Sequence, residues 1–479
     1  MSEAMIRPVG DPGDRRDEQS RDAGSRVDEA PFRARRAVVL AAGRSTRLSG
    51  MTGGGSKALL RVGGLSLVER AVRRLLALGM DEVVVVVGYH AGPVAALVNE
   101  IAPGRVQAVF AERWEDGNGA SLAAAELHVA EEPLFVLVTA DHVFGEGSIE
   151  ALVGAGQPAV LVDPAPAADI LEEGTRVQVE GGRAVAFSKA LPGPAVDCGA
   201  FLVPPAIFDA QRRAAAAGDP SLAGAVSSLA ARRGLGIVPV PPGSWWRDVD
   251  TPEDVRAVAR RLRRSLIKHA DGPVSRHLNR PLSTRLSMAI APLRVHPDLL
   301  SVLAALVGFG AAALLWHGLG VAGALLTHAM SVLDGVDGET ARLQERARPE
   351  GALLDGVLDR LSDAALVAGL AVWSVSEGQV SVNTALSLAV VATALSVLSM
   401  ATKDRVEALG LPPAPERTLT FLLGGRDARL LFLVVGALIG RPAWVLAAMI
   451  LTSGVTLVAR LVLVRAAARR AFVAAGTQS

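Results

Sequence analysis

Apolar residues are distributed unevenly along the 479-residue chain, and their pattern changes beyond its middle. From Ala37 onward, short apolar runs alternate with an amphipathic stretch and with loops. Such runs are AVVL (37–40), EVVVVVG (82–88) and PLFVLVTAD (133–141), and the amphipathic stretch is SLVERAVRRLLALGM (66–80). Strand and helix patterns that alternate in this way predict a parallel sheet with crossover helices. We therefore expect a Rossmann-like α/β domain in the first half of the chain.

Long apolar runs dominate the chain beyond about Leu299, at 299–316, 319–334, 352–375, 382–401, 428–440 and 443–464. Because a helix needs about 20 apolar residues to cross a bilayer, these runs predict an all-α domain of six transmembrane helices. The second and third runs become long enough only if the polar segment between them extends both helices. The expected parts are a disordered tail at 1–35, the α/β domain at 36–264, a linker at 265–298, the transmembrane domain at 299–470 and a tail at 471–479.

Basic residues concentrate between Arg256 and Arg294, among leucine, isoleucine and valine. For this segment we favour an amphipathic helix at the cytoplasmic membrane surface over a merely solvated charged helix. Loop charge predicts the orientation. Arginines and lysines gather at 342–348, 403–426 and 465–470, whereas the opposite loops carry one arginine between them. The positive-inside rule therefore predicts a multi-pass protein of the cell membrane, with the α/β domain and both termini in the cytoplasm.

Composition narrows the classes of function. The formal net charge is only +1, so the chain as a whole is not suited to binding nucleic acid. The single cysteine, Cys198, cannot form an intrachain disulfide, and the fold is therefore not expected to need an oxidising compartment. Residues 1–30 lack an apolar core and are rich in charge, glycine and proline, which predicts a disordered tail and not an export signal.

Four aspartates in the segment DGVDGETARLQERARPEGALLDGVLD (334–359) carry the most specific signal. Asp334 and Asp337 are spaced i,i+3, and Asp355 and Asp359 are spaced i,i+4, so each pair lies on one face of a helix. A helical hairpin would bring the four carboxylates together. Such a cluster is costly at a membrane boundary unless cations neutralise it, and oxygen ligands favour Mg²⁺ or Mn²⁺ over zinc. A structural acid cluster balanced by nearby arginines is the less favoured alternative.

The spacing D-x2-D-G-x2-A-R-x8-G-x3-D-x3-D resembles the signature of the CDP-alcohol phosphotransferases, a membrane family with six spans. The resemblance implies that Asp334, Asp337 and Asp355 hold metal ions, and that Asp359 joins them or acts as the base on the attacking hydroxyl group. It implies that the nucleotide lies against Gly338, Ala341, Arg342 and Gly351. Three arginines further along the chain have two compatible explanations: they follow from the positive-inside rule, or they bind the phosphate of an acceptor. These are Arg417, Arg426 and Arg429.

The segment LAAGRSTRLSGMTGGGSKALL (40–60) resembles the phosphate loop of nucleotidyltransferases. A glycine-rich turn after a strand presents backbone N–H groups to phosphates. By this resemblance Arg47 and Lys57 offset the charge of a triphosphate during catalysis. Ser45 departs from the family, which usually has its second glycine at that position. The start of the loop is expected to contact the nucleotide through Leu40, Ala41, Ala42 and Gly43.

Further features stand where this family would have them. Asp141 ends a strand, as the family's metal aspartate does. In DVD, either Asp248 or Asp250 would be the second metal ligand, and a helix cap is the alternative reading. DGNGASLAAA resembles the segment that reads base and ribose, which nominates Asn118 and Ser121, whereas a simple turn is the alternative. FSKAL and VDCGAF resemble the acceptor region of sugar-phosphate nucleotidyltransferases and nominate Lys189 for the incoming phosphate, over a plain surface lysine.

The two halves together resemble a family of bifunctional enzymes that join a cytidylyltransferase to a di-myo-inositol phosphate phosphate synthase. This resemblance covers nearly everything from Ala37 onward. It implies CTP and inositol 1-phosphate as substrates, CDP-inositol as intermediate, Mg²⁺ as cofactor and a homodimer. One alternative is a nucleotidyltransferase that activates another polar head group, fused to a phospholipid synthase with a lipid alcohol acceptor. Another is a nucleotidyltransferase on an inert membrane anchor.

Overall fold

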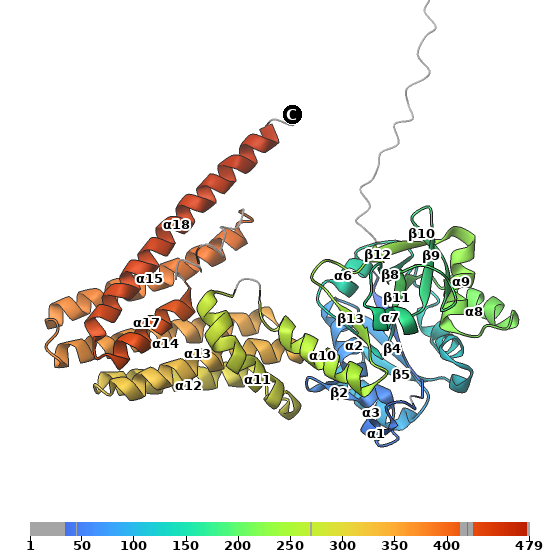
Figure 1. The fold of residues 1–479 in the computed structure, drawn as a ribbon, viewed down its shortest axis with the longest axis horizontal. Helices are drawn as coiled ribbons and strands as arrows, with labels where there is room; N and C mark the ends of the chain where they lie inside the picture. Colours follow the sequence, from blue (N-terminus) through green and yellow to red (C-terminus); the bar gives the residue numbers. More distant parts are fainter. Residues whose placement is uncertain (1–33, 45, 269–270, 412–418, 420–424, 477–479) are drawn as a thin grey trace, which may run out of the picture.

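The computed structural model describes residues 34–44, 46–268, 271–411, 419 and 425–476. Two bodies make up the described chain: a sheet flanked by helices, built from the first half, and a bundle of long helices, built from the second (Figure 1). Ser45, Arg417, nearly all of the expected tail at 1–35 and residues 477–479 lie outside the described residues.

A nine-stranded sheet forms the centre of the first body, in the order β5-β4-β1-β6-β11-β8-β12-β10-β9. Strand β1 (Arg36–Ala41) pairs in parallel with β4 (Glu82–Val87) on one side and with β6 (Phe135–Thr139) on the other. Valine fills these strands because β-branched side chains suit a pleated surface that is buried on both faces. Alternate side chains enter two separate cores, with Val39 in one and Val38 in the other. The α/β prediction for this half is confirmed.

The other elements of this half are mostly short. Its remaining strands are β2 (Arg61–Val62), β3 (Leu65–Ser66), β5 (Val106–Phe110), β7 (His142–Phe144), β8 (Ala159–Asp163), β9 (Arg176–Glu180), β10 (Arg183–Ser188), β11 (Val196–Val203), β12 (Leu235–Pro239) and β13 (Trp246–Asp248). Its helices are α1 (Ser49–Thr52), α2 (Leu67–Ala77), α3 (Ala91–Ile101), α4 (Asn118–Leu122), α5 (Glu126–Val129), α6 (Ser148–Val153), α7 (Ala168–Glu173), α8 (Ala206–Ala216), α9 (Leu222–Arg233) and α10 (Pro252–Ser265).

Long helices make up the second body, and each predicted apolar run falls mainly within one of them. They are α12 (Pro297–Trp316), α13 (Gly320–Leu343), α14 (Pro349–Ser376), α15 (Val382–Ala408), α17 (Arg426–Leu438) and α18 (Pro442–Gly476). Within the described residues, three are long and apolar enough to cross a membrane, over Pro297–Trp316, Val382–Val406 and Pro442–Arg470. The protein is therefore membrane-associated, and the number six for the spans stays a prediction.

The linker forms a π-helical turn at Ser275–Asn279 and then α11 (Arg280–Ile290). Glu339 of α13 is fully buried and ties α11 to the bundle, since its carboxylate accepts hydrogen bonds from Ser283 and Ser287 at 2.7 Å. Arg280 balances its charge at 2.7 Å. A buried carboxylate that is both paired and hydrogen-bonded avoids the cost of an isolated charge.

The sheet domain docks on the turn between α13 and α14. Leu343, the last residue of α13, belongs to the same buried cluster as Leu67 and Leu262 of the sheet domain. Arg70 of α2 is buried and donates hydrogen bonds to the Leu343 carbonyl oxygen at 3.1 Å and to the Val62 carbonyl oxygen at 2.8 Å. Glu345 lies 3.4 Å from both Arg70 and Arg74. Buried polar and apolar contacts therefore hold the two bodies together.

Two residues at this interface adopt left-handed backbone conformations without being glycine: Arg294 at φ 52° and Glu345 at φ 50°. Each side chain forms an ion pair with α2, Arg294 with Glu69 and Glu345 with Arg70. Such conformations cost of order 1–3 kcal/mol and persist where the surroundings fix them. The docking contacts are thus strong enough to hold two unfavourable backbone conformations.

Gly64 tests the docking because it touches the linker directly. Its φ is +87°, and a Cβ atom there would lie 2.5 Å from the Ala291 carbonyl oxygen. We expect the side chain of Gly64→Ala to push the two bodies apart. Amide hydrogen exchange in α2 and at 343–346 should then become about tenfold faster or more, which corresponds to a loss of ~1.4 kcal/mol in the free energy of local opening.

The control is Gly104→Ala, which has a similar φ of +80° but no atom within 4 Å of the new Cβ atom. It carries the same backbone strain without the clash. Equal exchange in the two variants would contradict the docking contact.

Candidate functional site

Sheet topology gathers three aspartates beside the end of β1. Asp141 follows β6, which lies next to β1 in the sheet. Strand β13 pairs antiparallel with β7, and this register places Asp248 opposite His142. Ligands of open α/β sheets bind outside the carboxyl ends of the parallel strands. The sequence placed Asp141 at such an end, and the structure brings Asp248 and Asp250 beside it.

Lys57 lies at the centre of these carboxylates. It begins a 3-10 turn, Lys57–Leu59, whose start is capped by Ser56. Its ammonium group is 2.5 Å from Asp250, 3.0 Å from Asp141 and 3.5 Å from Asp248. Burial disfavours the charged lysine, but the carboxylates of Asp141, Asp248 and Asp250 outweigh this effect and raise the pKa of Lys57 above its ordinary value. The side chain therefore remains a cation at neutral pH.

His142 is a residue of this site that the sequence reasoning did not assign. Its Nδ1 atom lies 2.7 Å from Thr139 Oγ1 and 2.9 Å from Asp141 Oδ1, and its ring stacks on Trp246 at 5.6 Å. Burial disfavours the charged ring, yet the carboxylates of Asp248 and Asp141 raise the pKa of His142 to about 9. The ring thus fixes the orientation of Asp141. Its position directly after Asp141 was the available signal.

The donor atoms of Asp141, His142 and Asp248 lie within 4.8 Å of one another. The Oδ1 atom of Asp248 is buried, accepts no hydrogen bond from the described residues and lies 3.5 Å from the Lys57 ammonium group. A buried carboxylate oxygen without a hydrogen bond fits a metal ligand, and carboxylates suit a hard divalent cation. Asp250 is outside this group of three residues, and its carboxylate pairs with Lys57 and, at 3.5 Å, with Arg47. Lys57 pairs with Asp141 as well, so the grouping of the donor atoms, and not the ion pairs, favours Asp141 and Asp248 over Asp250 as metal ligands.

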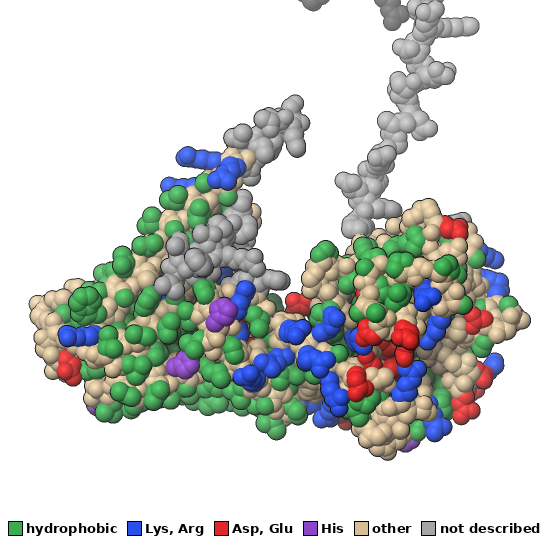
Figure 2. All heavy atoms as spheres, in the orientation of Figure 1, with side chains coloured by type: hydrophobic (Ala, Val, Ile, Leu, Met, Phe, Trp, Pro, Cys, Tyr) green, Lys and Arg blue, Asp and Glu red, His purple; other side chains and the backbone are tan. Residues whose placement is uncertain are grey.

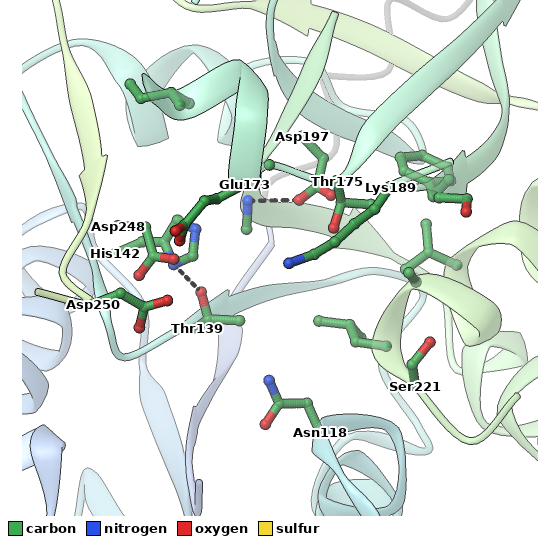
Figure 3. A pocket seen from close by; sticks show the side chains of 18 of the residues that line it. Asn118, Thr139, His142, Glu173, Thr175, Lys189, Asp197, Ser221, Asp248 and Asp250 are labelled. Atoms are coloured by element: carbon green, nitrogen blue, oxygen red, sulfur yellow. Dashed lines mark hydrogen bonds between the residues drawn. The ribbon is translucent and has the colours of Figure 1, made fainter. Parts of the chain in front are cut away.

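Two cavities adjoin these aspartates. The smaller, about 320 Å³, is lined by Lys57, Asp141, Asn118 and the loop residues Leu40, Ala41, Gly43 and Arg47. The other, about 830 Å³, is lined by Asn118, Lys189 and Asp248, and Figure 3 shows the Lys189 side chain reaching into it. Cavities of this size hold small ligands. Most of the residues predicted for nucleotide and acceptor binding thus share one region of space.

Three of the residues that the sequence predicts to contact the nucleotide are buried or already have partners in the protein. Ala42 is buried beneath the loop. Ser121 is buried, and its hydroxyl group donates to the Gly117 carbonyl oxygen at 3.1 Å, which stabilises the start of α4. Arg47 lines the smaller cavity, but its guanidinium group is already paired with Glu173 at 2.8 Å and with Asp250 at 3.5 Å.

Helices α13 and α14 bring a second group of aspartates together in the membrane domain. The carboxylates of Asp334, Asp355 and Asp359 lie within 4.8 Å of one another. Asp337 lies one turn along α13, and its carboxylate accepts hydrogen bonds from the Ser301 hydroxyl group of α12 and from the Gly338 N–H group. All the donor atoms of this group of aspartates are oxygens, which favours Mg²⁺ or Mn²⁺ over softer metal ions.

Arg426, at the start of α17, reaches into this second cluster. Its guanidinium group lies 2.8 Å from Asp334, 2.9 Å from Asp359 and 3.0 Å from Asp363. The sequence reasoning placed Arg426 at an acceptor's phosphate, whereas its partners in this structure are carboxylates. Asp363 was missed, although its i,i+4 spacing from Asp359 on α14 puts it on the same helix face.

The other residues predicted here are placed in different ways. An added Cβ atom would lie in ordinary van der Waals contact at both glycines, 3.5 Å from Arg342 at Gly338 and 3.6 Å from Asp298 at Gly351. Ala341 is half-buried. Arg342 donates a hydrogen bond to the Leu266 carbonyl oxygen at 3.1 Å and so points toward α10. Arg429 is buried, with its Nη1 atom 3.5 Å from the Ser453 hydroxyl group.

Comparisons with known proteins match both halves. The MobA-like NTP transferase domain matches residues 37–314, and the CDP-alcohol phosphatidyltransferase family matches residues 294–425. A bifunctional IPC transferase and DIPP synthase of Rubrobacter xylanophilus is 36% identical over 411 residues, covering 85% of this chain and 91% of that protein. The chain belongs to this bifunctional family. Proteins of the same name from Archaeoglobus fulgidus and Aquifex aeolicus are each 35% identical, covering 70% of this chain and 66% and 76% of their own lengths.

Membership of the family confirms the predicted pairing of a nucleotidyltransferase with a CDP-alcohol phosphotransferase on one chain. Both of these enzyme classes use divalent metal ions, and each acidic cluster described above has a donor set that suits such ions.

Binding of Mn²⁺, followed by electron paramagnetic resonance, tests the two clusters separately. We expect Asp248→Asn to weaken Mn²⁺ binding at the sheet domain and Asp355→Asn to weaken it at the membrane domain. Each loss should be about tenfold or more, because even the partners of metal ligands contribute that much. Asp209→Asn, which removes an exposed carboxylate paired with Arg212 on α8, should change neither. If Asp248→Asn and Asp355→Asn affected the same class of ions, the assignment of two separate clusters would be wrong.

Proposed function

We propose that this protein makes CDP-inositol from CTP and inositol 1-phosphate, and then transfers phosphoinositol from CDP-inositol to a second inositol 1-phosphate. The products are di-myo-inositol phosphate phosphate and CMP. The observation that carries the proposal is the presence of two separate acidic clusters on one chain, one at a sheet edge and one between membrane-domain helices. The bifunctional name of relatives that match most of the chain supports the same pair of activities.

In the first reaction, a phosphate oxygen of inositol 1-phosphate attacks the α-phosphorus of CTP, and pyrophosphate leaves. Lys57 stabilises the charge that grows on the phosphate groups, while the loop from Leu40 to Gly43 and Asn118 hold the nucleotide. Lys189 reaches into the larger cavity and is suited to the acceptor's phosphate. Asp141 and Asp248 would hold a divalent ion, Mg²⁺ or Mn²⁺, which supplies electrophilic activation of the phosphate when bound.

In the second reaction, a hydroxyl group of the acceptor attacks the phosphorus next to inositol, and CMP leaves. Asp334, Asp337 and Asp355 would hold divalent ions, which clamp the diphosphate when bound. Asp359 joins them or removes the proton of the attacking hydroxyl group. Gly338 and Gly351 have no side chains, which would allow the nucleotide to approach the helix backbones closely once the ends of Arg342 and Asp298 move aside. Arg426 is close enough to exchange a carboxylate for an incoming phosphate group, and Arg417 and Arg429 are further candidates for that contact.

We further propose that six helices span the membrane and that the sheet domain lies in the cytoplasm. Three of the six are supported by length and apolar character alone. The polar ends of α13 and α14 lie against the sheet domain, which supports a site at the cytoplasmic boundary. Arginines and lysines at this end agree with the positive-inside rule.

A coupled assay tests the substrates. Purified protein given CTP, Mg²⁺ and inositol 1-phosphate should release pyrophosphate and then CMP, with CDP-inositol detected by mass spectrometry. The final product should stay in water, because both of its halves are polar. A product that partitions into organic solvent would contradict the proposal in favour of a lipid acceptor.

Single substitutions test the division of labour. Asp355→Asn should lower CMP release from supplied CDP-inositol by about 10³-fold or more while sparing pyrophosphate release, since it acts only at the membrane site. Lys57→Ala should do the reverse. The spared reaction in each variant reports that the chain has folded. Loss of both reactions in a protein that keeps its helical circular dichroism would contradict the assignment.

A further inference from the structure

Helix α10 reaches from one site to the other. Its cap residue Thr251 and its first-turn residue Glu253 line the cavity of about 830 Å³ beside Asp248. Near its other end, Leu266 accepts a hydrogen bond from Arg342 at 3.1 Å, and Arg342 lies on α13, five residues after Asp337. The helix has 14 residues, so it spans about 21 Å. Helix α10 thus leads from the sheet-domain cavity to Arg342, which lies about 12 Å along α13 from Asp334 of the second cluster.

The inner face of α10 is committed to packing. Val258 and Leu262 belong to the buried cluster that also holds Val143 of β7. Two of its basic residues also have contacts of their own: Arg261 lies over the Trp245 ring at 5.8 Å, and Arg263 Nε donates to Thr284 at 3.3 Å. These residues are therefore explained by the fold.

The outer face carries basic residues that the fold does not explain. They follow one another at i,i+4 spacing and are exposed, and we call them the α10 ridge: Arg256, Arg260, Arg264 and, just beyond the helix, Lys268. Within the described residues, Arg256 pairs with Glu253 at 3.1 Å, and no carboxylate pairs with the side chains of the other three. Figure 2 shows basic side chains gathered over α10, between an acidic area of the sheet domain and the helical bundle.

We propose that the α10 ridge guides the nucleoside diphosphate ester made at the sheet-domain site to the membrane site. This proposal rests on the bifunctional activity proposed above. The intermediate carries two phosphates, and the cavity in which it forms is lined by Thr251 and Glu253, at the end of α10 that begins the ridge. The other end of the ridge lies at the contact between α10 and Arg342 of the membrane domain.

The spacing of the ridge suits short-range guidance. Side chains at i,i+4 lie about 5–6 Å apart, whereas the Debye length is about 8 Å at physiological salt. A diphosphate that leaves one cation is therefore still within the field of the next. Ion pairs at an exposed surface are individually weak, so each cation of the ridge can release the ligand to the next.

Lys268 lies near other basic residues at the far end of the ridge. Partial desolvation of its ammonium group, followed by the nearby charges of Arg342 and Arg280, lowers the pKa of Lys268, although Asp271 acts in the opposite direction. Basic side chains therefore gather where the ridge meets the membrane domain, which favours the arrival of an anion there. An anionic lipid surface could meet this end only, because Arg256 lies about 14 Å before the last residue of α10.

An isotope-dilution experiment tests the guidance. Full-length protein in a zwitterionic detergent receives [α-³²P]CTP, Mg²⁺ and inositol 1-phosphate, together with an excess of unlabelled CDP-inositol. Guided intermediate yields labelled CMP despite the excess, whereas released intermediate is diluted. We expect the double variant Arg260→Gln/Arg264→Gln to form about threefold to tenfold less labelled CMP than wild type. Its yield should approach the value reached when the labelled intermediate mixes completely with the unlabelled CDP-inositol in solution. The control, Arg213→Gln/Arg232→Gln, removes two exposed charges from α8 and α9 and should behave as wild type.

Salt provides a second test. At 1 M salt the Debye length falls to about 3 Å, below the spacing of the ridge, so wild type should then resemble the ridge variant. Equal yields of labelled CMP in the ridge and control variants would overturn the guidance. Complete mixing of the labelled intermediate with unlabelled CDP-inositol in wild type at low salt would overturn it as well. A difference that appears only after anionic lipid is added would overturn it in favour of a lipid contact. If wild type formed neither labelled CDP-inositol nor labelled CMP, the bifunctional activity itself would fail and the guidance with it.

Discussion

Crowded carboxylates repel one another unless a cation lies between them, and this constraint organises both halves of the molecule. In the sheet domain, Lys57 lies within 3.5 Å of three aspartates. In the membrane domain, Arg426 lies within 3.0 Å of three others. Each cation comes from a segment remote in sequence from most of its partners, so each site forms only when its domain has folded. A bound metal ion would have to share these carboxylate oxygens with the side-chain cation.

The docking of the two bodies follows from similar physics. Arg70 is buried and would be costly without partners, and the Leu343 carbonyl oxygen and Glu345 supply them from the membrane domain. The same contact holds the turn that joins α13 to α14, the two helices that carry the second acidic cluster. It also fixes α10 between the sites. The relative position of the clusters is therefore a property of the folded chain.

Local spacing made part of this structure predictable. The i,i+4 spacing of Asp355 and Asp359 and the position of Asp141 after a strand need only helix and strand periodicity, and both placements agree with the structure. Contacts between distant elements were not predictable in this way. The approach of Arg426 to Asp363 depends on how α17 packs beside α14. The hydrogen bond from Arg342 to α10 depends on the docking of two domains. Ser121 looked suited to a ligand, but its hydroxyl group is used by its own helix.

The central claim is that two displacements at phosphorus occur in series at separate sites. The fate of labelled phosphorus tests it most directly. When the chain is given [α-³²P]CTP and unlabelled inositol 1-phosphate, all the label should pass through CDP-inositol into CMP. When ³²P is placed in inositol 1-phosphate instead, all of it should appear in the final diester product and none in CMP. Label from the α-phosphate of CTP in the final product would contradict the proposed order of bond breaking.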